Sequence, residues 1–336
     1  MPSKITTNVQ HALRDTGAGR FFCNLFSYIA GFTQLLFTKP AYLDHFLRPS
    51  KHVKSVKYGT HSSQFLDVFP CESKLGKDAP VIAFVHGGAW GSGHPYMYRL
   101  LGVRLAMEGF HCILIGYRTY PCADILGQLD DVQEALSYIR RRIGFGELSS
   151  IGKNSQIYLS GHSSGAHVVA QCVLQRSKTL DFIKGVIGFG GAYDLKSQYE
   201  CEKSKDVHEL SPLKAANKGV ENFNRFSPFV IASNLKSFTY AGAEDDGSEQ
   251  KQAVSVPKSH EQKQALSVPK FLLLHGLKDT TVPPSQSENL MAASKDKFPC
   301  EMELLDGVAH SDIVTDMFDL EKEIKYLERI KKFCNM

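Results

Sequence analysis

The sequence lacks the residue patterns that mark metal sites and disulfide frameworks. Its eight cysteines include no C-x-x-C pair and no Cys/His cluster with zinc spacing. There is no N-x-S/T sequon and no H-E-x-x-H motif, so a helical zinc-protease site is excluded. We therefore expect reduced cysteines and no metal, although eight scattered cysteines leave a disulfide bridge open.

The chain also lacks a surplus of charge of one sign. It has 39 Lys and Arg against 35 Asp and Glu, a formal charge of +4 over 336 residues. This balance gives no electrostatic footprint for nucleic acid. Hydrophobic residues make up 43% and charged residues 22%, which excludes disordered and fibrous classes. A chain of this length can bury a large core, either as two domains or as one α/β unit.

Charge is missing altogether from residues 21–38, within an N-terminal hydrophobic region that we place at 1–50. Eighteen uncharged residues reach the lower limit for a membrane span. Their apolar positions also recur at the spacing of an amphipathic helix. We expect this helix either to associate with a membrane or to cover a pocket as a soluble lid. The matching locations are an endomembrane of the endoplasmic reticulum type or the cytoplasm.

Residues 51–336 have the pattern of an α/β domain. Apolar and polar residues alternate over 53–69, which predicts an antiparallel hairpin. Continuous apolar strands then alternate with helices, which predicts a mostly parallel sheet with helices on both faces. The predicted strands are 81–86, 111–117, 156–160, 186–189, 271–275 and 301–305, and the predicted helices are 98–108, 129–142, 165–175, 285–294 and 311–333.

Two segments interrupt this alternation. Residues 193–234 contain Ser211-Pro212 and an aromatic cluster, and we expect a helical excursion that forms a small cap over the sheet edge. Residues 249–270 hold a tandem repeat, in which EQKQAVSVPKSH is followed by EQKQALSVPK. Two copies are too few for a solenoid, so we expect a duplicated surface loop.

The motif Gly161-His162-Ser163-Ser164-Gly165 follows a predicted strand and opens a predicted helix. This is the context of a nucleophile elbow, in which a serine occupies a tight, strained strand-to-helix turn. Small residues on both sides allow the turn, and the helix N-terminus lies near the developing oxyanion. The pattern predicts Ser163 as a nucleophile.

A second glycine motif, His86-Gly87-Gly88-Ala89-Trp90, follows an earlier strand. Glycines let backbone N–H groups approach a substrate oxygen closely. We expect an oxyanion hole formed by N–H groups of Gly87, Gly88, Ala89 and Ser164. The order of an H-G-G loop before a serine elbow is that of H-G-G lipases and esterases.

A serine nucleophile needs a base, and the base needs an orienting carboxylate. In this fold the order along the chain is serine, acid, histidine. Asp279 follows the predicted strand 271–275, and His310 follows the last strand. Both positions fall at the same sheet edge as Ser163, so we predict Asp279 as the orienting acid and His310 as the base. This chemistry needs no cofactor.

With these motifs the chain resembles an α/β-hydrolase of the H-G-G esterase group. It is most similar to the isoprenylcysteine methylesterases, through the two glycine motifs, Tyr117-Arg118-Thr119-Tyr120-Pro121 and Phe226-Ser227-Pro228. The resemblance implies hydrolysis of the methyl ester on a prenylated cysteine, a small-molecule or lipid-modified substrate. A long apolar trough for it would be lined by Trp90, Tyr96, Phe226 and Phe229.

Three other readings stay open. Kynurenine formamidases share H-G-G, the elbow and the order of the triad, and imply cleavage of N-formylkynurenine. A broad detoxifying carboxylesterase would act on unrelated acetyl and butyryl esters. The fold also supports non-catalytic binding proteins such as gibberellin receptors, in which the histidine is lost, but here Ser163, Asp279 and His310 are all present.

Overall fold

The computed structural model describes residues 53–235 and 268–336. The expected helix at 21–38 and all but the last three residues of the repeat at 249–270 lie outside these ranges. The boundary that we placed between 1–50 and 51–336 therefore remains a prediction. Within the described ranges, no helix is long and apolar enough to cross a membrane.

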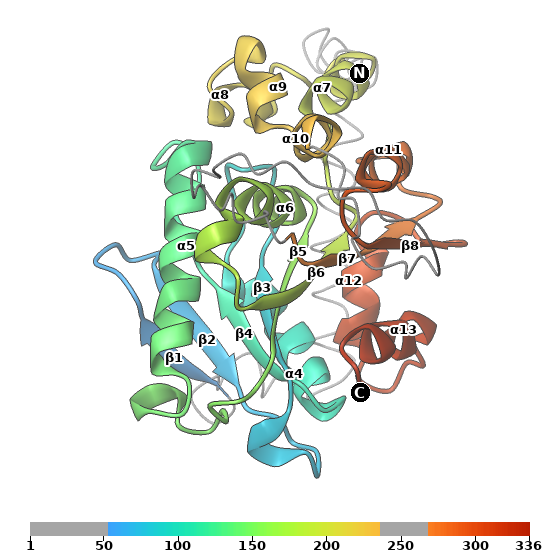
Figure 1. Ribbon diagram of the computed structural model, residues 1–336. Helices are drawn as coiled ribbons and strands as arrows, with labels where there is room; N and C mark the ends of the chain where they lie inside the picture. Colours follow the sequence, from blue (N-terminus) through green and yellow to red (C-terminus); the bar gives the residue numbers. More distant parts are fainter. Residues whose placement is uncertain (1–52, 236–267) are drawn as a thin grey trace, which may run out of the picture.

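In the described ranges, the strands form a central eight-stranded sheet (Figure 1). Its order is β1-β2-β4-β3-β5-β6-β7-β8, and the first three strands pair antiparallel while the rest pair parallel. The predicted hairpin and mostly parallel sheet are confirmed. The strands are β1 Lys54–Lys57, β2 Phe65–Phe69, β3 Val81–Val85, β4 His111–Ile115, β5 Ile157–His162, β6 Ile183–Phe189, β7 Lys270–Gly276 and β8 Cys300–Leu305.

Helices cover both faces of this sheet, and four helices from 195 to 234 form the cap (Figure 1). Alternate residues along each parallel strand point to opposite faces, so a strand buried on both sides is apolar throughout. In β3, Val81 and Ala83 pack in the core on one face, and Ile82 and Phe84 pack in the core on the other. The helices are α4 Arg99–Met107, α5 Ile125–Arg142, α6 Ser164–Arg176, α7 Leu195–Lys203, α8 Leu213–Ala216, α9 Phe223–Phe226, α10 Pro228–Asn234, α11 Ser285–Ser294, α12 Asp312–Thr315 and α13 Lys325–Phe333.

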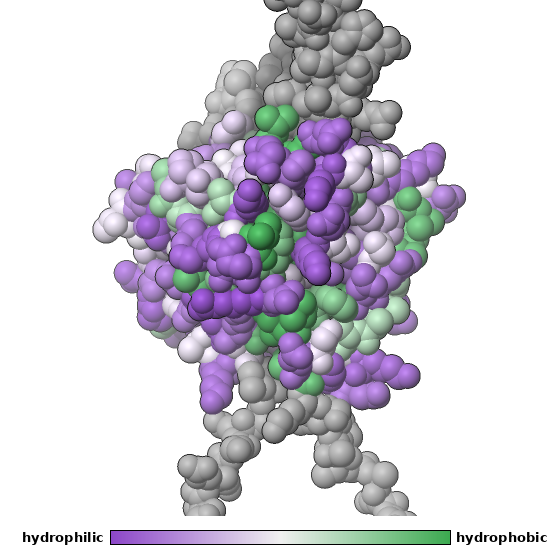
Figure 2. All heavy atoms as spheres, turned by 90° about the horizontal axis from the view of Figure 1, so that it is seen from above, coloured by the Kyte–Doolittle hydropathy of each residue, from purple (hydrophilic) through white to green (hydrophobic). Residues whose placement is uncertain are grey.

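The cap side presents a mixed surface. Seen from above, hydrophobic side chains gather in the middle of this face with hydrophilic side chains around them (Figure 2). Leu210 and Val220, both in the cap segment, are among the exposed large hydrophobic residues.

The N-terminus of α7 is capped by Asp194, whose carboxylate accepts from the N–H groups of Lys196 and Ser197.

The predicted continuous helix at 311–333 is wrong. The chain forms α12, a 3-10 turn at Asp316–Phe318, and then α13, with a non-helical stretch between them. Arg104 of α4 stabilises this non-helical stretch. Its buried guanidinium donates to the carbonyls of Asp319 and Lys322, at 3.0 Å each. Helix periodicity alone carries no signal of a partner so far away in the sequence.

The helix predicted at 129–142 begins four residues earlier, at Ile125. Its cap is Asp124, whose carboxylate accepts from the N–H groups of Leu126 and Gly127. Asp124 stands directly after Pro121-Cys122-Ala123 and before an apolar residue, so the capping signal was present in the sequence.

Candidate active site

Ser163 occupies the sharp turn between β5 and α6. Its backbone has φ 55° and ψ −124°, a left-handed conformation that is strained for a side chain with a Cβ. The turn needs glycine on both sides. A Cβ on Gly165 would lie 2.4 Å from the carbonyl oxygen of His86, and one on Gly161 would lie 2.6 Å from Gly165. The local geometry therefore presents the hydroxyl of Ser163 at the sheet edge.

The side chains of Ser163, His310 and Asp279 form one hydrogen-bonded chain. Nε2 of His310 lies 2.9 Å from Oγ of Ser163, and Nδ1 of His310 lies 2.6 Å from Oδ2 of Asp279. A carboxylate accepts only, so Nδ1 carries the proton and Nε2 accepts from the serine hydroxyl. The three elements that bring them together are the loops after β5, β7 and β8.

Asp279 is held as an ionised, oriented acceptor. Its Oδ1 accepts from the N–H groups of Thr281 and Val282, at 2.9 and 2.8 Å. Burial by itself raises the pKa of the Asp279 carboxyl, but attraction to His310 and hydrogen bonds from His275 and His310 outweigh it and hold that pKa well below its usual range. The carboxylate therefore carries its charge at neutral pH.

The H-G-G loop brings backbone N–H groups toward this serine. A Cβ on Gly87 would lie 3.0 Å from Cβ of Ser163, which shows how closely the loop approaches the elbow. Among the described residues, the N–H groups of Gly88, Ala89 and Ser164 have no hydrogen-bond partner. The N–H of Gly87 donates instead to the hydroxyl of Tyr98, 3.3 Å away. We therefore leave Gly87 out of the set of oxyanion donors.

His162, the variable residue of the elbow, links this loop to the loop of His310. Its Nε2–H donates to the carbonyl of His310 (3.1 Å), and its Nδ1 accepts from the hydroxyl of Tyr98 (3.1 Å). Burial, followed by repulsion from His310, lowers the pKa of His162 to about 3. The imidazole is therefore neutral, which is the form that can donate and accept at once.

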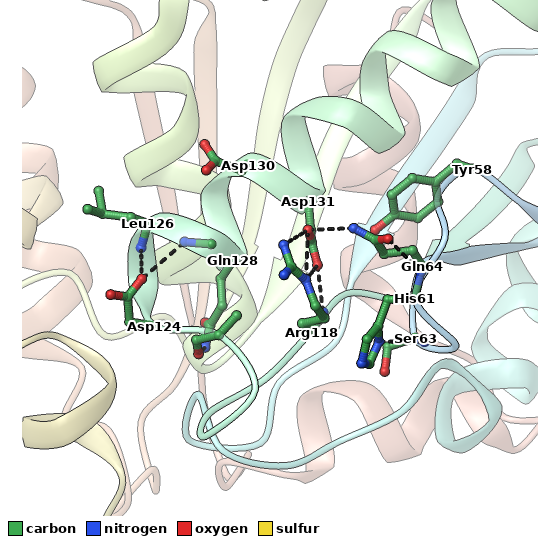
Figure 3. Close-up of polar contacts among 12 residues, drawn as sticks. Tyr58, His61, Ser63, Gln64, Arg118, Asp124, Leu126, Gln128, Asp130 and Asp131 are labelled. Carbon is green, nitrogen blue, oxygen red and sulfur yellow. Dashed lines mark hydrogen bonds and ion pairs between the residues drawn. The ribbon is translucent and has the colours of Figure 1, made fainter.

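The residues Tyr117 to Pro121 support the H-G-G loop from behind. The hydroxyl of Tyr117 donates to the carbonyl of His86 (2.9 Å), and the N–H of Tyr120 donates to the carbonyl of Trp90 (2.8 Å). Arg118 fixes this segment by a bidentate ion pair with Asp131 of α5, which Gln64 also contacts (Figure 3). The motif is structural in this geometry.

A cavity of about 210 Å³ lies beside Ser163, between the sheet edge and the cap. Trp90 lines it, as the sequence predicted, and its indole N–H donates to Nδ1 of His167 (2.9 Å). The other three expected aromatic residues do not line this cavity. Phe226 is fully buried in the core, because the cap helix turns it inward. Tyr96 is exposed and its ring lies tilted against the ring of His94, and Phe229 is partly buried in α10.

Sequence reasoning missed the polar wall of this cavity. Gln198, Glu202 and Lys205 line it from α7 and the residues just after it. Their spacing of four and three places them on one face of a helix, and that spacing was the available signal. In the described parts of the chain, no group of three His, Cys, Asp or Glu side chains is placed to hold a metal ion.

Comparisons with known proteins find hydrolases that are similar to this chain. The chain is similar to a probable isoprenylcysteine alpha-carbonyl methylesterase of Oryza sativa subsp. japonica, 28% identical over 274 residues, covering 78% of this chain and 58% of that protein. It is also similar to kynurenine formamidase of Drosophila melanogaster, 25% identical over 60% of this chain and 73% of that protein. The expected resemblance to isoprenylcysteine methylesterases, with kynurenine formamidases also similar, is confirmed. The chain spans about six tenths of the length of the plant relatives.

Solved structures support the fold. Esterase B from Lactobacillus rhamnosis superimposes with a TM-score of 0.62 at 17% identity, covering 90% of this chain and 95% of that one. The predicted α/β-hydrolase fold is confirmed. The family model BD-FAE matches residues 66–293, which is more than half of the chain. This chain therefore belongs to the BD-FAE family of esterase-like α/β-hydrolase domains.

Proposed function

We propose that this chain is a serine hydrolase that cleaves a hydrophobic carboxylic ester, such as a prenylcysteine methyl ester, through an acyl-enzyme. The observation that carries the proposal is the continuous hydrogen-bonded chain from Ser163 through His310 to the ionised Asp279. It lies beside N–H groups that have no partner among the described residues.

In the first half of the reaction, Oγ of Ser163 attacks the ester carbonyl while Nε2 of His310 takes the hydroxyl proton. The carbonyl oxygen becomes an oxyanion, and the N–H groups of Gly88, Ala89 and Ser164 are the donors available to it. Each such donor contributes about 3 kcal/mol to lowering the barrier. The tetrahedral intermediate collapses, and the alcohol leaves with the proton from His310.

In the second half, the same Nε2 takes a proton from water as its oxygen attacks the acyl-enzyme. A second oxyanion forms in the same place and collapses, which frees the acid and returns the proton to Ser163. Asp279 keeps Nδ1 protonated throughout and stabilises the imidazolium in both halves. The 2.6 Å contact between these two groups supports that role.

Two observations support a hydrophobic ester as substrate. The cavity beside Ser163 has largely apolar walls, which include Ala89, Trp90 and Val282. Several relatives are named as isoprenylcysteine alpha-carbonyl methylesterases or probable ones. Contact of residues 21–38 with a membrane that holds the lipid-modified substrate stays a prediction.

A second candidate is an arylformamidase acting on N-formylkynurenine. It is favoured by coverage, because this chain spans 73% and 67% of two kynurenine formamidases but only 58% of a methylesterase from rice. The same triad would attack a formamide carbonyl, and His310 would protonate the departing amine.

The test compares kcat/KM for S-farnesylcysteine methyl ester and N-formylkynurenine, with Ser163→Ala as the inactive variant. A matched control is Ser160→Ala, which removes a buried hydroxyl three residues earlier that has no partner among the described residues. A fluorophosphonate probe should label the wild-type protein and the Ser160 variant but not the Ser163 variant. A folded wild-type protein that neither turns over substrate nor takes the label would favour the non-catalytic binding protein.

A further inference from the structure

The wall of the cavity that faces away from the sheet carries charge and hydrogen-bonding groups. Gln198 and Glu202 belong to α7, and Lys205 follows that helix by two residues. All three line the same cavity as Ser163, whose remaining walls are largely apolar. A simple hydrocarbon chain or a methoxy group has no hydrogen-bond donor to pair with these side chains.

The hydrogen bonds of this wall leave acceptors without donors. Nε2 of Gln198 donates to the carbonyl of Thr281 (3.0 Å) and to Oε1 of Glu202 (3.3 Å). These bonds fix which end of the Gln198 amide is the nitrogen. Its Oε1 and the Oε2 of Glu202 are buried and accept no close hydrogen bond from a described residue, although the hydroxyl of Ser211 lies near the Glu202 carboxylate. Unpaired buried acceptors are unfavourable, so a donor group on a molecule bound in the cavity would stabilise this arrangement.

The nearest cation of the wall is already engaged. Nζ of Lys205 donates to the carbonyl of Thr280 and to Sγ of Cys201. Burial raises the pKa of Glu202, and the nearby Ser211, Gln198 and Lys205 only partly offset that effect. Glu202 is thus a poorly compensated carboxylate, which a bound cation would stabilise.

We propose that the cavity binds a substrate with a primary ammonium group close to the scissile carbonyl, and that Glu202 and Gln198 hold this ammonium. The proposal rests on the proposed function, because it assigns the cavity of Ser163 to the substrate. An ammonium offers three donors, enough for both free acceptors, and its bond to a carboxylate is charge-assisted. A neutral alcohol offers one donor for each hydroxyl.

The substrate class that follows is an ester or formamide of an amino compound whose amine is unacylated. An amino-acid ester with a free amine would be accepted. The same ester with its amine in an amide bond, as inside a peptide, would lose the charge and two of the three donors. The enzyme would then act on a free amino-acid ester. Peptide hydrolysis is the class of reaction that must release such an ester from a protein before the enzyme acts.

The first experiment measures kcat/KM for S-farnesylcysteine methyl ester with a free amine and with an acetylated amine. The wild-type protein should prefer the free amine by about tenfold or more, as expected when a buried polar site loses its partner. Glu202→Gln should reduce this ratio strongly. Glu200→Gln makes the same charge change on the exposed face of α7 and should retain the wild-type ratio. A wild-type ratio near one, or the same ratio in both variants, would overturn the proposal.

The second experiment separates this proposal from the proposed catalysis. Calorimetry with Ser163→Ala measures the Kd of the same two esters without turnover, alone and combined with Glu202→Gln. Tighter binding of the free amine that disappears with Glu202→Gln supports the ammonium site even if no ester is hydrolysed. Equal Kd values for both esters overturn the ammonium site even if the wild-type protein is an active esterase.

Discussion

Acidification should destabilise this protein through three histidines that are buried around the site. His86, His162 and His167 are each at most 5% exposed. Burial lowers their pKa values from 6.5 to about 4, 3 and 4 respectively. Between pH 6.5 and about 4, the unfolded chain binds three protons that the folded chain does not. The free energy of unfolding therefore falls as the pH falls through this window and is unaffected above it.

The size of this effect follows from the shifts. At pH 5.0 each histidine costs about 2 kcal/mol of stability relative to neutral pH, so the three together cost about 6 kcal/mol. Domains are typically stable by about 5–15 kcal/mol, so this loss is a large part of the total. Groups that titrate identically in two variants do not contribute to the difference between their free energies of unfolding.

The assay is urea unfolding followed by circular dichroism at pH 7.5 and 5.0, for wild type and His167→Gln. Nδ1 of His167 accepts from Trp90, and its Nε2 donates to the carbonyl of Phe226. Glutamine can both accept and donate but does not titrate, so the loss between the two pH values should shrink by about 2 kcal/mol. Val173→Ala, buried on the same helix, should lower stability equally at both. An unchanged loss in the glutamine variant would refute the reasoning.

Three further changes test the proposed catalysis. Asp279→Asn should lower kcat by about 10⁴-fold because His310 takes the wrong tautomer. The measurement is stopped-flow hydrolysis of a short ester, and a wild-type rate in this variant would exclude Asp279 as the orienting acid. Gly88→Ala should lower kcat about 100-fold by displacing the N–H of this residue. The added Cβ would lie 2.3 Å from the carbonyl oxygen of Ser92, at a backbone φ of +135°. Circular dichroism would verify that the variant is folded. Deleting residues 1–40 should raise KM for S-farnesylcysteine methyl ester and leave KM for a short soluble ester nearly unchanged; an equal loss on both would indicate a folding role.

The positions of Ser163, Asp279 and His310 were readable from the sequence because each depends on local chemistry. Glycines flank the serine because the turn leaves no room for a Cβ. The acid and the histidine each follow an apolar strand, and the carboxyl ends of parallel strands meet at one sheet edge. Chain order and strand pattern together were enough to predict that these three side chains meet, and the structure brings them within hydrogen-bond distance.

Other features depend on residues that are distant in the sequence. The N–H of Gly87 is taken by Tyr98, eleven residues later, so a motif that offers several donors does not reveal which remain available. Phe226 is an aromatic residue of the cap, but only the packing of α9 decides that its ring lies in the core rather than in the cavity. The aromatic cluster by itself fits either side.

The sequence by itself determined the class of fold, the nucleophile elbow and the order of the three candidate catalytic residues, since strand periodicity and turn sterics are local. Only the tertiary structure decided where the final helical segment breaks, which N–H groups have no partner and which side chains line the cavity. Arg104 and Tyr98 decide the first two points by hydrogen bonds to residues outside their own segments. Helical spacing indicates that Gln198 and Glu202 share one face of α7, but only the packing of the cap brings that face to the cavity. Such bonds form only when folding brings distant segments together, so no pattern within one segment can encode them.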